Sequence, residues 1–433
     1  MSTQKLFRRV FVTVIGFAIA VLPNAAWAAP GDPDTSFDGD GFQTLNLPGS
    51  QNDEAYAVLQ LSNGRIVLGG ETGSGGPDDA AVARFRGNGG LDTSFSGDGS
   101  FTLDIRGVGG DDRIEELAQQ DDGKILAFGW AENADGSASH MAILRFRTNG
   151  TLDPTFSGDG LLLVKFRGYT GAFGYVGAVQ DDGGILIAGQ VGTIGSETDW
   201  DFAIARITAG GRLDGTFGGG DGRAVTNFSG DDGIQAMAIQ SDGKALVGGW
   251  AHNPGQDNYR SAFARYRTNG TLDPTFSGDG KKILDVSDVN DEVDSIGIRG
   301  DGKSVAVSGV GGDPLALIRL TTRGKADPTF HGDGFLIVDP VPAGLGDADL
   351  DLAGKKLIVT AETFDNQIFV ARFKPNGDLD TGFGGGDGFI LATFPGASQS
   401  SPNASALQSN GRILTAGFAQ IGSQDFGVAR FLP

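Results

Sequence analysis

One phrase, close to Leu-Asp-x-x-Phe-x-Gly-Asp-Gly, recurs seven times along the chain and constrains the fold more than any other feature. The copies begin near residues 33, 91, 152, 213, 272, 326 and 379. Their phenylalanines lie 53 to 61 residues apart, at Phe37, Phe95, Phe156, Phe217, Phe276, Phe330 and Phe383. A period of this length indicates stacked copies of one supersecondary unit. The repetition runs from residue 31 to 433, so we expect a single domain over residues 29–433.

Each unit reads as four short strands. The first follows the phrase, the second alternates apolar and polar residues as in 235–240, the third resembles 65–69, and the fourth contains Ala-Arg-Phe or a close variant, as in 83–85. Between the second and third strands, six units carry Asn-Gly or Asp-Gly, for example Asn63-Gly64, and the sixth unit has Ala353-Gly354. Asx-Gly supplies the positive φ angles of a two-residue hairpin, so the sequence predicts tight hairpins here.

Four antiparallel strands repeated seven times predict an all-β fold, a seven-bladed β-propeller. The 73 glycines agree, because each interior glycine costs a helix about 1 kcal/mol relative to alanine. A parallel β-helix is the main competing fold, but its coils are shorter and lack the Asx-Gly hairpin.

These phrases resemble the delta-60 repeat proteins. The matching text is Leu152-Asp-Pro-Thr-Phe-Ser-Gly-Asp-Gly160, the Gln-x-Asp-Gly-Lys hairpin and the Ala-Arg-Phe strand, over residues 31–433. The resemblance implies a propeller of exported or surface bacterial proteins without an established activity. The hairpin also resembles NHL-type propeller repeats, in which the strand before the turn is innermost. That resemblance implies that residues 43–47 complete the last blade beside 403–431, a clasp in a chain with no cysteine.

Residues 1–28 have the pattern of a cleaved signal peptide. Lys5, Arg8 and Arg9 precede an apolar run from Val10 to Leu22, and Ala26-Trp27-Ala28 gives a small-residue cleavage site. The run is short for a membrane span, which disfavours a retained anchor. The Arg pair partly matches a twin-arginine signal, but general secretion is the favoured interpretation. We expect an exported protein, periplasmic, cell-surface or secreted.

Composition excludes several classes of partner and site. The mature chain has 30 basic and 54 acidic residues, a net charge of −24, which repels nucleic acids and anionic lipids. We therefore expect neither nucleic-acid binding nor membrane binding. We also expect the protein to be a monomer. The absence of cysteine excludes disulfides and thiolate chemistry, and a three-histidine zinc site would need all of the chain's histidines.

Two charged residues recur in every unit, the aspartate of the phrase and the arginine of the fourth strand. Strand alternation places the arginine against a neighbouring blade, where a buried cation needs a partner. We predict structural Arg–Asp pairs, with candidates Arg84, Arg145, Arg206 and Arg265 and Asp92, Asp153, Asp214 and Asp273.

Calcium is the one cofactor that the sequence leaves open; otherwise we expect none. The first phrase has Asp34, Asp38 and Asp40, the closest approach to the alternating oxygen ligands of a calcium loop. The other copies have Ser, Gly or His where Asp38 stands, and a glycine-flanked aspartate is usually a turn residue.

The connections that vary between units lie on one face of a propeller, which is where we expect a binding site. Candidate binding residues there are Trp130, Trp200, Trp250, Tyr169, Asp111, Asp112, Asp231 and Asp232. Exposed aromatic rings stack on sugars and carboxylates accept hydroxyl hydrogen bonds. For any single residue, however, a loop acid or a packed tryptophan is the more common role.

Two functions remain. The favoured one is an exported, non-catalytic binding or scaffold module for protein or glycan, because no catalytic motif is recognisable. The alternative is a hydrolase or lyase acting on polysaccharide through loop carboxylates near the channel at the centre of the propeller, with or without the aid of calcium. The sequence does not decide whether the protein is an enzyme, but it favours a protein that is not.

Overall fold

The structure is a computed structural model that describes residues 28–196, 200–252, 258–287, 289–310, 315–338, 345–354 and 356–433. The predicted signal peptide lies outside these residues except for Ala28. Within them, no helix is long and apolar enough to cross a membrane.

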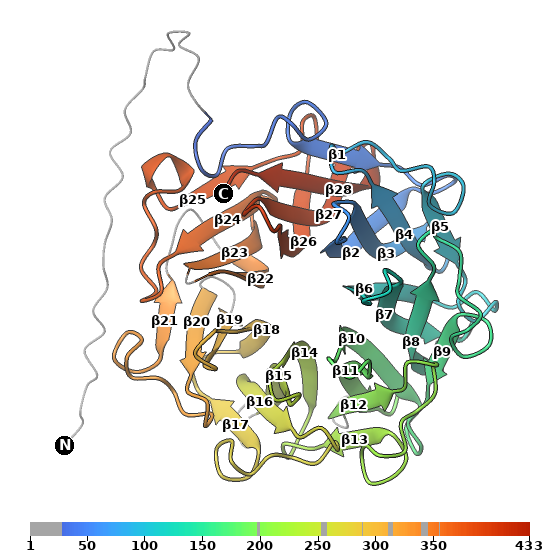
Figure 1. The fold of residues 1–433 in the computed structure, drawn as a ribbon, viewed down its shortest axis with the longest axis vertical. Coiled ribbons are helices and arrows are strands. Elements are labelled where there is room, and N and C mark those ends of the chain that lie inside the picture. The colour runs from blue at the N-terminus through green and yellow to red at the C-terminus, as the bar shows by residue number, and fades with distance from the viewer. Residues whose placement is uncertain are drawn as a thin grey trace.

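The fold is all-β and consists mostly of four-stranded antiparallel sheets arranged in a ring (Figure 1). The first eight strands are β1 (Phe42–Leu45), β2 (Asn52–Gln60), β3 (Ile66–Gly73), β4 (Asp79–Phe85), β5 (Ser100–Leu103), β6 (Asp112–Gln119), β7 (Ile125–Glu132) and β8 (Ser139–Phe146). The next ten are β9 (Leu161–Val164), β10 (Gly171–Val179), β11 (Ile185–Gly192), β12 (Asp201–Ile207), β13 (Arg223–Thr226), β14 (Asp232–Ile239), β15 (Ala245–His252), β16 (Tyr259–Tyr266), β17 (Lys281–Leu284) and β18 (Asp291–Ile298). The last ten are β19 (Ser304–Val310), β20 (Leu315–Leu320), β21 (Phe335–Val338), β22 (Leu345–Ala353), β23 (Lys356–Thr363), β24 (Ile368–Phe373), β25 (Phe389–Ala392), β26 (Ser400–Leu407), β27 (Ile413–Ile421) and β28 (Ser423–Phe431). A short 3₁₀ turn, η1 (Gly384–Gly386), precedes β25.

Five sheets, which begin at β6, β10, β14, β18 and β22, each contain four consecutive strands. The remaining eight strands form one sheet in the order β26-β27-β28-β2-β3-β4-β5, with β1 paired to β28. Within it, β28 and β2 meet through one parallel pair, Asn52 with Gln424, whereas β1 pairs with β28 antiparallel over four residues. The N-terminal strand therefore adds a fourth strand to β26–β28, from the opposite end of the chain.

The inner strands, such as β2, β6 and β10, line the centre of the ring, and β5, β9 and β13 lie at its rim (Figure 1). The apolar core lies between neighbouring sheets. One cluster joins Val67 and Val82 of one sheet to Ile114 and Ala127 of the next. Each sheet buries both faces, which accounts for the apolar runs in the second and third strands of a sheet.

The hairpins differ in one detail from the sequence expectation. Only the glycine of each Asx-Gly pair has a positive φ, for example +81° at Gly64, while Asn63 does not. Leu61 and Arg65 form a backbone pair, so the loop has three residues, and the Asn63 side chain accepts a hydrogen bond from the Arg65 N–H at 3.0 Å. The turn is thus a type I turn followed by a left-handed glycine, which needs only one left-handed residue.

The recurring arginine and aspartate lie together in each repeat. Their closest atoms are 2.7–3.0 Å apart in the pairs Arg84–Asp92, Arg145–Asp153, Arg265–Asp273, Arg319–Asp327, Arg372–Asp380 and Arg430–Asp34. Arg206 contacts both Asp214 and Asp182. In six repeats the guanidinium also lies over the phenylalanine of the phrase, at 4.7–4.9 Å from the ring centre.

Arg265 illustrates why arginine recurs here. Its side chain donates to Asp273 (3.0 Å), to Thr275 (2.9 Å) and to the Thr322 carbonyl of the next repeat (2.7 Å). Lysine cannot reproduce this planar fork, so we expect Arg265→Lys to lower the free energy of unfolding by about 2–3 kcal/mol. Arg267→Lys is the matched control, because Arg267 is 44% exposed and lies 3.7 Å from the same aspartate. Denaturant unfolding of both variants checks this, and equal stabilities would contradict it.

Candidate functional site

Every inner strand is interrupted at a corresponding position by a register shift. In β2 the shift lies between Ala55 and Ala57, and in β6 between Ile114 and Glu116. Corresponding shifts occur in β10, β14, β18, β22 and β26. A β-bulge leaves one residue unpaired and redirects its side chain. In the strands with a single unpaired residue, these residues are Tyr56, Glu115, Tyr175, Gln235, Asp294 and Asn403.

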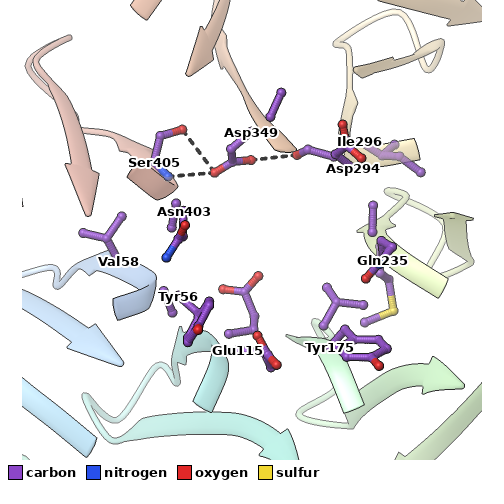
Figure 2. Close-up of a pocket in the computed structure, with 18 of the residues that line it drawn as sticks. Tyr56, Val58, Glu115, Tyr175, Gln235, Asp294, Ile296, Asp349, Asn403 and Ser405 are labelled. Atoms are coloured by element: carbon purple, nitrogen blue, oxygen red, sulfur yellow. Dashed lines mark hydrogen bonds between the residues drawn. The ribbon is translucent and has the colours of Figure 1, made fainter. Parts of the chain in front are cut away.

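All six of these bulge residues line a cavity of about 400 Å³ at the centre of the ring, which we call the central channel (Figure 2). Its lining includes five carboxylates, Glu115, Glu116, Glu292, Asp294 and Asp349, and among the described residues it includes no Lys, Arg or His. The same β-bulge thus recurs in each inner strand, while the side chain that it directs into the cavity differs from strand to strand.

Hydrogen bonds fix several of these carboxylates. The Trp130 indole donates to Glu115 at 2.9 Å, and Gln235 donates to Glu292 at 2.7 Å. Asp349 accepts from the Ser405 N–H at 2.8 Å and from the Ser295 hydroxyl, also at 2.8 Å (Figure 2). Most of these bonds span different sheets, so the ring of strands itself orients the acids.

The nearest arginine is already neutralised. Arg113 makes two hydrogen bonds to Glu71, at 2.6 and 3.0 Å, and lies 4.3 Å from the centre of the Tyr56 ring. It is 3.8 Å from Glu115, a weaker contact. Arg113 therefore adds little positive charge to the central channel.

Burial strongly perturbs these acids. Burial raises the pKa of Glu115 to about 7, although Arg113 and the Trp130 hydrogen bond lower it in part. Burial also raises the pKa of Glu116 to about 8, with Asp349 and Asp351 adding to the effect. The pKa of Asp351 is raised by burial and by its neighbour Asp349. Carboxyls that titrate near neutrality are unusual and mark candidate functional sites.

The pH dependence of stability follows from these pKa values. Carboxyls with raised pKa hold their proton in the folded state, so stability is lost as pH rises from about 4, the unfolded pKa, through 7. Aspartates such as Asp273, whose pKa of about 2 results from hydrogen bonds and nearby cations that outweigh burial, lose their contribution only at low pH. We expect the melting temperature to peak near about pH 5 and to be several degrees lower at pH 8. Thermal unfolding followed by circular dichroism tests this, and a maximum at pH 8 would contradict it.

The acids predicted from the loops support the backbone. Asp112 and Asp232 are fully buried and accept hydrogen bonds from the backbone N–H groups of Ile105 and Phe228 respectively. Asp111 and Asp231 accept from the backbone N–H groups of Asp78 and Trp200, both at 3.0 Å. These four acids lie at the starts of β6 and β14 and do not line the central channel.

The three tryptophans predicted to bind a ligand pack against other aromatic rings of the protein. Trp130 is 9% exposed and lies edge-on to Phe173 at 5.1 Å. Trp200 lies 5.6 Å from the same ring, and Trp250 packs against Tyr259 at 4.6 Å. Tyr169 is half-buried and lines a second cavity near the rim. Of the predicted residues, Trp130 alone is hydrogen-bonded to a residue of the central channel among the contacts described.

The candidate calcium ligands do not converge. The buried Asp34 is 2.8 Å from Arg430 and 2.6 Å from Arg412, and the Asp40 carboxylate accepts from the Phe42 N–H at 2.9 Å. Asp38 is exposed in a left-handed turn, with a φ of +48°. In the described part of the chain, no group of three or more His, Cys, Asp or Glu residues is arranged to hold a metal.

Sequence reasoning placed the loop carboxylates of the alternative function near the channel of the ring, but it missed the residues that line the central channel. One signal was present: Glu115-Glu116 interrupts the apolar alternation of the second strand, and the corresponding position is polar in several repeats. Alternation alone does not reveal which residue bulges, because a bulge changes the register without a fixed residue type.

A family model described as "Domain of unknown function (DUF5122) beta-propeller" matches residues 61–95, 120–156, 180–217, 240–276, 355–383 and 408–433. These matches support a β-propeller repeat family for the chain. No curated protein matches the sequence.

Several solved structures are similar in fold. A streptogramin B lyase has 12% identity and a TM-score of 0.49, with coverage of 90% of this chain and 97% of that chain. The polysaccharide lyase Uly1 has 11% identity and a TM-score of 0.48, with coverage of 90% and 92%. Sqt1 from Chaetomium thermophilum, bound to the N-terminus of ribosomal protein L10, has 14% identity and a TM-score of 0.46, with coverage of 90% and 99%.

Proposed function

We propose that this protein is an exported, non-catalytic binding module, a seven-bladed β-propeller of the delta-60 repeat type that takes a cationic segment of a partner protein into its central channel. The observation that carries the proposal is the lining of that channel, which has five carboxylates and, among the residues that the structure describes, no basic residue. The predicted signal peptide supports export.

The arrangement of strands supports seven blades and closure by the N-terminus. Five sheets have four strands, and the eight-stranded sheet divides at its single parallel pair into β2–β5 and β26–β28 with β1. Each of these sets is antiparallel. The pairing of β1 with β28 supports a closed ring in which the two ends of the chain share one blade.

A cation suits the central channel better than a neutral ligand. Carboxylates in a partly desolvated cavity attract a cation more strongly than they do in water. Tyr56 and Tyr175 also line the cavity, and tyrosine rings attract ammonium and guanidinium groups through their faces. The bulges lie at or just before the middle of the inner strands, and these strands start from the variable connections. A ligand that enters from the predicted binding face would therefore reach them within half the length of a strand.

Calorimetric titration with hexalysine tests the proposal. We expect saturable binding that weakens as salt is raised and strengthens from pH 6 to 9, because Glu115 and Glu116 ionise over that interval. Hexaglutamate and a neutral oligosaccharide serve as controls. Failure of hexalysine to bind, or equal binding of hexaglutamate, would contradict the proposal.

A polysaccharide hydrolase or lyase is the second candidate. It is favoured by the pKa of Glu115, about 7, since a carboxyl that holds its proton near neutrality can serve as a general acid. This function predicts release of sugar products from polysaccharide and loss of that release in Glu115→Gln. Hexalysine binding without any turnover favours the binding module.

A further inference from the structure

A second cavity, of about 520 Å³, lies between the outer strands β9 and β13 at the rim of the ring and differs in character from the acidic central channel. We call it the rim pocket. Figure 1 shows β9 and β13 as the outer strands of adjacent blades. Its polar lining is mostly basic: His140 from β8, Lys165 and Arg167 after β9, and Arg223 at the start of β13. This concentration of basic residues occurs in a chain with a formal net charge of −21.

The charge of the rim pocket is specific to one blade. His140 and Lys165 are the residues just beyond the last paired position of β8 and β9, Met141 with Val164. The equivalent pairs described elsewhere are Asp79 and Asp104, Asp201 and Asn227, Asp425 and Asn46, Arg260 and Asp285, and Gln367 and Thr393. Four of these five contain an aspartate, and the fifth is uncharged. Among the six described pairs, only the pair at the rim pocket has a basic residue without an acidic one.

Most of the basic groups of the rim pocket lack an acidic partner; Arg223 has one, Asp221, to whose backbone carbonyl it also donates at 3.0 Å. Lys165 and Arg167 are exposed and make no ion pair in the part of the chain that is described. The Arg223 Nε and the His140 Nδ1 are buried and have no hydrogen-bond partner among the described residues. The single acid in the described lining, Asp221, is 63% exposed and lies 3.7 Å from the Arg223 guanidinium. Unpaired buried polar atoms cost free energy, so a ligand that satisfies them gains affinity.

The corresponding place beside β13 and β17 differs in charge from the rim pocket. There Lys281, in the place of Arg223, donates to the Asn227 carbonyl at 3.1 Å and lies 5.1 Å from the Phe228 ring. Asn227, not a lysine, faces it. Arg223 lies 6.0 Å from the corresponding ring of Phe166, so the position is shared while the charge facing it is not.

We propose that the rim pocket binds a small ligand through an oxyanion, either an inorganic sulfate or phosphate or the carboxylate of a sugar acid. Arg223 and Lys165 supply charge-assisted donors from two sides, His140 and Arg167 complete the ring of donors, and Phe166 and Tyr169 form apolar walls. The site is independent of the proposed binding of cations in the central channel.

Titration of the whole protein with sulfate, phosphate and glucuronate at constant ionic strength tests the proposal, with chloride as reference. We expect one of these anions to saturate a single site, and the anion that does so identifies the source of the oxyanion. Lys165→Asn places the residue of the equivalent Asn46 and Asn227 in the pocket, so it should fold normally. We expect it to weaken binding about tenfold or more, and Arg223→Gln to do the same.

Lys325→Asn is the matched control, because Lys325 is an exposed lysine in a turn of another repeat and its loss changes the net charge equally. A second readout is the proton NMR signal of His140. Burial first, then Arg106 and Lys165, hold the pKa of His140 below the usual value, and a bound anion should raise it. The signal of His331, in an exposed turn away from the rim pocket, serves as the internal reference. No saturable binding of any of the three anions, or an equal loss in Lys325→Asn, would overturn the proposal.

Discussion

Removal of residues 30–48 from the mature protein lowers its melting temperature by more than about 10 °C, if the N-terminal strand closes the ring. The segment supplies β1, which pairs with β28 over four residues, and two side chains that are almost fully buried, Phe37 and Leu47. Loss of a buried phenylalanine or leucine costs about 2–5 kcal/mol each.

The same deletion leaves charged and aromatic groups without partners. Arg430 loses Asp34, its ion-pair partner at 2.8 Å, and the Phe37 ring over which it lies. Phe42 packs edge-on against Phe394 at 5.6 Å and Phe431 at 6.1 Å, so both rings become more exposed. A buried arginine without its carboxylate is strongly destabilising.

The reference is the mature chain that begins at Ala29, and differential scanning calorimetry gives both melting temperatures. A chain in which residues 30–48 are moved from the N-terminus to follow Pro433 is the matched control, since Leu432 already hydrogen-bonds to Asp32. It keeps the strand and should regain most of the stability. An unchanged melting temperature in the deletion would show that β1 does not close the ring.

At pH 9, where both acids are ionised, the double variant Glu115→Gln with Glu116→Gln weakens hexalysine binding by about a hundredfold or more. Each charged hydrogen bond contributes about 1.5–3 kcal/mol, and two of them correspond to at least two decades of affinity. Glutamine keeps the shape of glutamate, and the side-chain oxygen of the glutamine introduced at position 115 can still accept from the Trp130 indole, so the ring of bulges should be preserved.

The same variant should be more stable than the wild type at pH 8 and equally stable at pH 5. Glutamine resembles the protonated acid, whose proton the folded state retains because the pKa values of Glu115 and Glu116 are about 7 and 8. Asp38→Ser is the control: Asp38 is exposed, and serine occupies the corresponding position of several other repeats. A control that loses as much affinity as the double variant would indicate that net charge, not the central channel, binds hexalysine.

The repeat made the fold predictable to a large extent. The recurring phrase, the Asx-Gly pairs and the Ala-Arg-Phe strand lie at the predicted boundaries because each depends on local turn geometry and strand alternation, which a sequence displays directly. The hairpin turn was predicted only in part. The sequence predicted a two-residue loop with a positive φ at both Asn63 and Gly64, whereas the structure has a three-residue loop in which only Gly64 has a positive φ.

The central channel was less predictable for a physical reason. Tyr56, Glu115 and Asp294 come together from blades that are distant in sequence, and each is redirected by a bulge that carries no residue signature. Sequence reasoning therefore favoured Trp130 and Asp112 in the loops. In the structure these two residues have supporting roles: the Trp130 indole donates a hydrogen bond to Glu115, and the Asp112 carboxylate accepts one from a backbone N–H.

Cation binding in the central channel is tested most directly by a crystal structure of the protein grown with hexalysine. We predict a lysine ammonium in the central channel, within hydrogen-bond distance of Glu115 and of at least one of Glu116, Asp294 and Asp349. Hexalysine bound only on the outer surface, with the central channel empty of it, would contradict the proposed function.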